Sequence, residues 1–107
     1  MAIGFVVHQY MTNLARDFPT LTEAPGISPW SPNQLDIWAA NHSFQPQAIN
    51  AARFLLTVWN QSNDWECGHF DVLEAIRSWD DAHRAALVRW IRSPRLPHHQ
   101  NGFHLLR

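Results

Sequence analysis

The chain has 107 residues, 46% of them hydrophobic and 16% charged, which excludes a disordered segment and leaves room for one domain with one core. Its single cysteine, Cys67, excludes an internal disulfide, and no apolar run approaches the roughly 18 residues of a membrane span. The net charge of −1 is uneven: residues 1–75 carry two arginines against seven acids, or −5, and residues 76–107 carry six arginines against two acids, or +4.

The N-terminal segment predicts a helix followed by a loop. Apolar residues recur every three or four positions between Ile3 and Phe18 and form one helical stripe, which Pro19 ends. Because β-branched side chains occur among the first ten residues, a strand remains an alternative to a helix there. The opening residues lack the basic start and the long apolar run of a secretory signal, so we expect a cytoplasmic protein. Residues 19–32 carry four prolines and a glycine, which is typical of a loop.

Two helices are predicted in the middle of the chain. Ser31 and Pro32 suit the N-cap and the first position of a short helix that reaches about Asn41. From Gln47 to Asn60, apolar side chains cover most of the helical circumference. A helix that is apolar on most sides is buried on most sides, so we expect this segment to be the central helix.

Two more helices are predicted after a loop that ends at Phe70. The first covers residues 71–79. The second begins at Asp80 or Asp81 and ends near Arg92, with acids at its start and arginines at its end, as the helix dipole favours.

Prolines end the last helix, and the tail from about residue 94 is expected to be irregular. The prediction is an all-α fold, a compact bundle of four or five short helices with Pro-rich connections, in one domain over residues 1–107.

The last predicted helix places His83 at the centre of its apolar face, between Trp79 and Trp90. A buried neutral imidazole needs partners for one donor and one acceptor, whereas catalysis would also need a cleft and a second reactive group. We therefore expect His83 to be a structural core residue, and we expect the same role for Trp59, Trp79 and Trp90.

The opposite face of this helix predicts an exposed ridge of Arg84, Val88 and Arg92, with Arg84 paired to Asp80, four residues before it. Such a ridge is either a solvated face or a contact for a negatively charged partner. Six tryptophans and a basic C-terminal part suit an interface, because Trp and Arg dominate binding energies. The candidate partner-binding residues are Arg84, Arg89, Arg92, Arg95, Trp65 and Trp30.

The candidate metal ligands are a C-x-H pair and three tail histidines: Cys67, His69, His98, His99 and His104. They would meet only if the tail folds against the loop, and structural zinc sites usually show two closely spaced pairs. No metal or other cofactor is therefore predicted. Glycine-rich phosphate loops, G-x-S-x-G and H-E-x-x-H do not occur in the sequence, so the chain is not predicted to be an enzyme.

A motif runs through the C-terminal half: a phenylalanine and an acid, then W-D-x-x-H-R-x-A, then a closing W and P. Its residues are Phe70, Asp71, Trp79, Asp80, His83, Arg84, Ala86, Trp90 and Pro94. On this motif, residues 59–97 resemble small uncharacterised helical proteins of bacterial mobile elements. The resemblance implies a setting rather than an activity. Mobile elements and phages encode small inhibitors of host defence, anti-CRISPR proteins among them.

We therefore predict a non-enzymatic protein that binds another protein or protein complex, in its sharper form a mobile-element or phage inhibitor of a host defence complex. A second hypothesis is a nucleic-acid-binding accessory protein that uses the basic C-terminal part. A helix-turn-helix over residues 71–92 is disfavoured, because its turn lacks glycine and because Asp80 and Asp81 would repel phosphates. The sequence also leaves open a small zinc-stabilised module and a homodimer.

Overall fold

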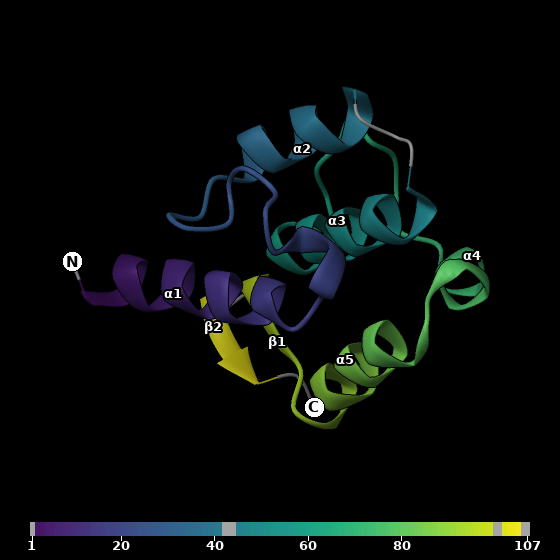
Figure 1. Cartoon of the computed structure of the whole chain (residues 1–107). Coiled ribbons are helices and arrows are strands. Elements are labelled where there is room, and N and C mark those ends of the chain that lie inside the picture. Colours follow the sequence, from purple (N-terminus) through teal and green to yellow (C-terminus); the bar gives the residue numbers. More distant parts are fainter. Residues whose placement is uncertain (1, 42–44, 100–101, 106–107) are drawn as a thin grey trace.

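The computed structural model describes residues 2–41, 45–99 and 102–105 (Figure 1). Five α-helices and one short 3-10 helix account for most of it, so the predicted all-α bundle is confirmed. The helices are α1 (Ala2–Arg16), η1 (Pro19–Leu21), α2 (Pro32–Asn41), α3 (Pro46–Trp59), α4 (Val72–Ser78) and α5 (Asp81–Arg92), followed by the strands β1 (Arg95–His99) and β2 (Gly102–Leu105).

Helix α3 lies in the middle of the bundle, with α2 on one side and α1 and α5 on the other (Figure 1). Eight of its 14 residues are buried, as expected for a helix that is apolar on most sides. The fully buried side chains around it come from separate elements and include Met11, Phe18, Leu21 and Leu35. One continuous core therefore joins the N-terminal half of the chain to α3.

Capping residues explain where the last two helices begin. The Asp71 side chain accepts hydrogen bonds from the backbone N–H groups of Leu73 and Glu74, and the Asp80 side chain accepts one from the backbone of His83. These carboxylates satisfy N–H groups that have no partner within the helix. The first ten residues, for which the sequence also allows a strand, are helical from Ala2 onwards.

The loop before α2 is held closely against the bundle. Gly26 has a φ of +83°, and a Cβ there would lie 2.5 Å from the Ser31 carbonyl oxygen, so a side chain has no room. The Thr12 hydroxyl donates to the Ile27 carbonyl, which fastens the loop to α1. Trp30, at the end of this loop, is thereby placed in the core.

The sequence predicted an irregular tail, but the tail forms an antiparallel hairpin. Arg95 pairs with Leu105, and Leu96 pairs with His104, with a register irregularity before His99. Pro97 lies inside β1, where it gives up one backbone donor. A two-stranded ribbon tolerates this, because each strand leaves one edge unpaired. Among the described residues, none of the helices has both the length and the hydrophobicity that a bilayer crossing requires.

Candidate functional site

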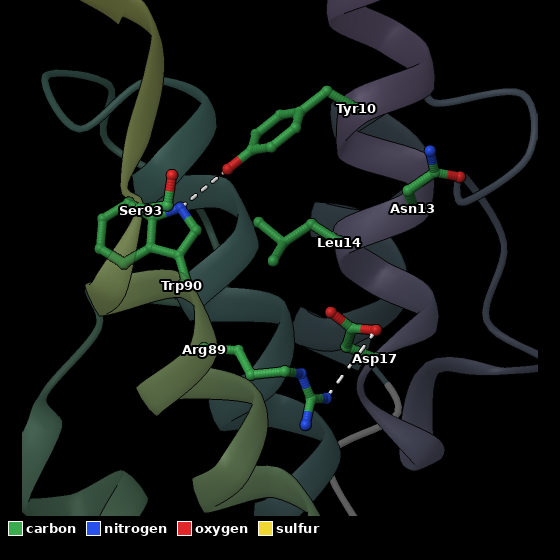
Figure 2. A pocket seen from close by; sticks show the side chains of 7 residues that line it. All are labelled: Tyr10, Asn13, Leu14, Asp17, Arg89, Trp90 and Ser93. Atoms are coloured by element: carbon green, nitrogen blue, oxygen red, sulfur yellow. Dashed lines mark hydrogen bonds and ion pairs between the residues drawn. The ribbon is translucent and has the colours of Figure 1, made fainter. Parts of the chain in front are cut away.

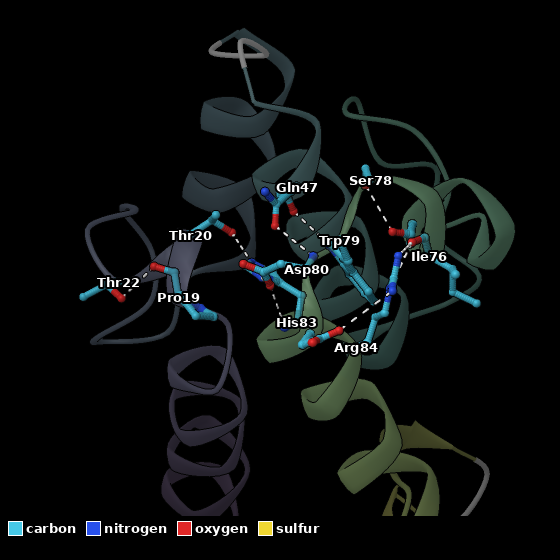
Figure 3. Close-up of polar contacts among 12 residues, drawn as sticks. Pro19, Thr20, Thr22, Gln47, Ile76, Ser78, Trp79, Asp80, His83 and Arg84 are labelled. Atoms are coloured by element: carbon cyan, nitrogen blue, oxygen red, sulfur yellow. Dashed lines mark hydrogen bonds and ion pairs between the residues drawn. The ribbon is translucent and has the colours of Figure 1, made fainter.

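His83 lies in the core, as its position on the helical wheel predicts, with 1% of its surface exposed (Figure 3). Both ring nitrogens have partners: Nδ1 lies 2.7 Å from Asp80 Oδ1 and Nε2 lies 2.8 Å from Thr20 Oγ1. The ring centroid lies 5.9 Å from those of Phe18 and Trp79. The imidazole therefore joins η1 to the start of α5 and has a partner for its donor and for its acceptor.

Asp80, His83 and Thr20 are connected in the same order as the carboxylate, imidazole and hydroxyl of a catalytic triad. A triad needs a cleft in which a substrate reaches the hydroxyl and the neighbouring imidazole nitrogen. Here two aromatic rings cover the imidazole, which is almost fully buried, whereas the Asp80 side chain is 59% exposed. The arrangement thus fits a structural bridge between helices rather than a catalytic centre.

The sequence predicted an ion pair between Asp80 and Arg84, and the structure shows that this prediction is wrong. Its carboxylate is turned towards His83, and the hydrogen bond from that side chain is the main cause of its lowered pKa. Arg84 instead donates from Nε and Nη2 to the Ile76 carbonyl, at 3.2 and 2.7 Å, and lies 3.9 Å from Asp81 (Figure 3). Arg84 thereby satisfies a carbonyl near the C-terminal end of α4 and connects α4 to α5.

Exposed apolar side chains gather on these two helices. Of the seven large hydrophobic residues that are exposed in the described part of the chain, five lie on α4 and α5. Leu73 and Ile76 are 69% and 40% exposed, and Val88 and Ile91 are 47% and 56% exposed. Residues three or four apart are neighbours on a helix, and Arg84 connects the two helices. We call this the α4–α5 surface: Leu73, Ile76, Arg84, Val88, Ile91 and Arg92.

The charge along α5 is positive beyond its first turn, which holds Asp81. From Ala82 to His99 the sequence contains four arginines and no acid. Arg84 and Arg92 are exposed on the outer face of α5, and Arg95 is exposed at the start of β1. Three of the four predicted partner-binding arginines are therefore exposed at or next to this surface.

Arg89, the fourth, faces α1 instead. Its Nη2 lies 3.9 Å from Asp17 Oδ1, and the indole of the next residue, Trp90, donates to the Tyr10 hydroxyl at 2.9 Å (Figure 2). Burial is the main cause of the raised pKa of Tyr10.

A cavity of about 300 Å³ lies between α1 and α5 at these residues, lined by Tyr10, Asn13, Leu14, Asp17, Arg89, Trp90 and Ser93. A second cavity, of about 560 Å³, is lined by Arg16, Thr22, Glu23, Ala24, Ile27 and Ser28.

Trp30 and Trp65 were predicted as partner contacts, and the structure corrects this. They are only 5% and 8% exposed. Trp30 packs against Trp59, with ring centroids 5.7 Å apart, and the Trp65 indole donates to the Asn60 carbonyl at 3.2 Å. Both lie in loops, where helical periodicity does not report burial. Among the described side chains, the large hydrophobic residues that are exposed are therefore all aliphatic.

The structure separates the two loop residues proposed as metal ligands. Cys67 is buried, and burial raises the pKa of its thiol to about 12, with Asp36 contributing further. The His69 side chain is 67% exposed, and its Nε2 contacts Asp64 at 3.2 Å. Among the described side chains, no three His, Cys, Asp or Glu gather where a metal would bind. The side chains of His98, His99 and His104 are outside the described part.

Asp36 is a buried acid that the sequence analysis did not single out. It is 7% exposed, and its two carboxylate oxygens accept the backbone N–H groups of Glu66 and Cys67 at 3.0 and 2.9 Å. The signal available in the sequence was an acid directly after Leu35 in this short predicted helix, because an acid that becomes buried needs buried donors. Asp36 holds the loop before α4 against α2.

Comparisons with protein-family models, with curated proteins and with solved structures find no match for this chain, so the case for the candidate site depends on its own geometry.

Proposed function

We propose that this protein acts without catalysis, by binding another protein through the α4–α5 surface. The observation that supports this most directly is the arrangement of Val88 and Ile91. Both are about half exposed and lie on a helix whose neighbouring charges, Arg84 and Arg92, are both positive. Exposed aliphatic side chains surrounded by arginines are typical of a protein interface with an apolar centre and a charged rim.

The charge indicates the chemistry of the partner. The three arginines exposed at or next to this surface, Arg84, Arg92 and Arg95, favour an acidic partner surface and would speed association with it. When a partner covers Val88 and Ile91, each side chain would contribute about 1 kcal/mol to the free energy of binding. This is half the usual value for an aliphatic side chain, because each is already half buried. The partner we propose is thus a protein surface with an apolar centre surrounded by carboxylates.

Two features favour a protein over a nucleic acid. The guanidinium of Arg84 is already bound to the Ile76 carbonyl, which leaves it less free to follow a phosphate backbone. Val88 and Ile91 also occupy the positions between the arginines, where a phosphate-binding helix needs polar groups. More specifically, we propose that the protein is a cytoplasmic inhibitor of a host defence complex, encoded by a mobile element or a phage. The resemblance over residues 59–97 supports this.

The test is affinity capture from bacterial lysate with matched variants. Ile91→Asp places a charge in the α4–α5 surface, and Ile37→Asp does the same at an equally exposed isoleucine on α2, since both side chains are 56% exposed. We expect the unaltered protein and Ile37→Asp to capture the same stoichiometric partner. Ile91→Asp should bind it at least about tenfold more weakly, as expected for a central apolar contact.

Three outcomes would overturn the proposal. The first is that no stoichiometric protein is captured, and the second is that Ile91→Asp captures the partner as well as Ile37→Asp does. The third is a dimer in light scattering that Ile91→Asp alone dissociates, which would make the occupant a second copy of the chain. Titration with duplex DNA at low salt serves as a separate check, because phosphate binding would show steep salt dependence.

A further inference from the structure

Helices α1 and α5 are joined by two side-chain bridges with a cavity between them. At one end the Trp90 indole donates to the Tyr10 hydroxyl at 2.9 Å, and at the other Arg89 Nη2 lies 3.9 Å from Asp17 Oδ1. Leu14 points into the space between the two bridges (Figure 2). The cavity of about 300 Å³ is therefore lined by Leu14 and two aromatic rings, by the polar side chains of Asn13 and Ser93, and by a pair of opposite charges at one end.

The two bridges differ in kind. The first has the length of a normal hydrogen bond, whereas a nitrogen-to-oxygen distance of 3.9 Å is too long for one. Arg89 and Asp17 thus attract each other by charge without exchanging a hydrogen bond. Their side chains are 57% and 43% exposed, so both can be reached by a small molecule. Each has hydrogen-bonding capacity that a ligand of the right charge would use.

The spacing of the two charges restricts the ligand. A carboxylate bound to Arg89 alone would meet the negative charge of Asp17, and a cation bound to Asp17 alone would meet Arg89. A molecule with neighbouring positive and negative groups satisfies both. Each end of a peptide supplies only one of these charges, whereas a free α-amino acid carries both on groups attached to the same carbon atom.

We propose that this cavity binds the zwitterion of a free α-amino acid with an apolar or aromatic side chain. Its carboxylate would lie on Arg89 and its ammonium group on Asp17, with the side chain between Leu14 and Trp90. The volume is at the lower end of the range of about 300–1,000 Å³ found for ligand pockets, which suits one amino acid. The site is formed by a different side of α5 from the α4–α5 surface and does not depend on the proposed protein binding.

The test is a titration of the ¹⁵N-labelled full chain with L-phenylalanine and L-leucine, followed by NMR. The reporter is the indole N–H signal of Trp90, identified by its loss in Trp90→Phe, because this proton bonds to Tyr10 beside the cavity. We expect a saturable shift of this signal. N-acetyl-L-phenylalanine, which lacks the ammonium group, and phenylalanine amide, which lacks the carboxylate, should each bind at least about tenfold more weakly. Glycine should also bind more weakly, because it lacks the apolar side chain.

Charge variants supply the second arm. Arg89→Gln and Asp17→Asn should each weaken L-phenylalanine binding at least about tenfold, whereas Arg77→Gln and Asp64→Asn, at exposed positions elsewhere, should leave it unchanged. The proposal is overturned by any of three results: no saturable shift up to the solubility limit of the amino acids, equal binding of the blocked derivatives, or an equal loss in the control variants. Ile91→Asp should still bind the amino acid, which separates this site from the α4–α5 surface.

Discussion

One carboxylate oxygen of Asp80 accepts two hydrogen bonds from His83, from the backbone N–H at 3.0 Å and from the imidazole Nδ1–H at 2.7 Å. The first bond caps α5. The second places the imidazole proton on Nδ1, since a carboxylate only accepts, and so leaves Nε2 to accept from the Thr20 hydroxyl when the ring is neutral. The cap of one helix and the polar contact within the core are therefore parts of a single connection.

Removal of this connection should destabilise the fold. His83→Ala creates a cavity beside Phe18 and Trp79 and leaves the Thr20 hydroxyl without its partner, so we expect a loss of about 2–4 kcal/mol in the free energy of unfolding. Urea denaturation followed by circular dichroism measures it. His69→Ala, at an exposed histidine, is the control and should change the value by less than about 0.5 kcal/mol. Equal effects of the two variants would show that His83 has no structural role.

The contribution of Asp80 to stability should depend on pH. The hydrogen bond from His83 lowers the pKa of this carboxyl in the folded state below its ordinary value of 3.8. Folding is then favoured by the ionised form, so the contribution is fully present above the ordinary pKa and is lost as the pH falls through the lower folded value. The difference in unfolding free energy between the unaltered protein and Asp80→Asn should therefore shrink in strong acid.

The control for that experiment is the same comparison in a His83→Gln background. Because the imidazole donor is then missing, the pH dependence of the Asp80→Asn difference should become weaker. A difference that stays constant across the acidic range in the unaltered background would contradict the account of Asp80.

Cys67 should be unreactive in the folded protein. Burial raises the pKa of its thiol to about 12, and the nucleophile in disulfide exchange is the thiolate, so at neutral pH almost no reactive form is present. We expect slow reaction with a chromogenic disulfide reagent in buffer and fast, complete reaction in urea. Fast reaction in buffer would show that the loop around Cys67 opens readily.

The helices could be predicted because each of their signals is local. The apolar stripe between Met11 and Phe18, the prolines that begin α2 and α3, and the acids that begin α4 and α5 act within one or two helical turns. The position of His83 follows from the same periodicity. Here the pattern along the sequence and the packing of the fold agree.

The site could be predicted only in part, because its remaining features depend on which elements meet. Nothing in α5 alone indicates that Arg89 faces Asp17, since that contact requires α1 to pack beside it. Trp30 and Trp65 are buried by the paths of their loops, which no helical repeat describes. The hairpin depends on the pairing of two short segments whose proline and histidines do not form an alternating strand pattern.

Asp36 offers a final test of these long-range contacts. Asp36→Ala removes the acceptor for the backbone N–H groups of Glu66 and Cys67, and it leaves one buried donor and one partly buried donor unpaired. We expect a loss of about 2–5 kcal/mol in the free energy of unfolding, measured by urea denaturation, because bonds to an ionised acceptor are strong and buried donors are costly to leave unmade. The thiol of Cys67 should react faster in the variant even where the protein remains folded, because the loop loses its attachment to α2. Asp64→Ala, at a carboxylate whose side chain is 97% exposed, should leave both measurements nearly unchanged. If Asp36→Ala destabilised the fold without any change in the thiol reaction, Asp36 would stabilise α2 rather than the loop.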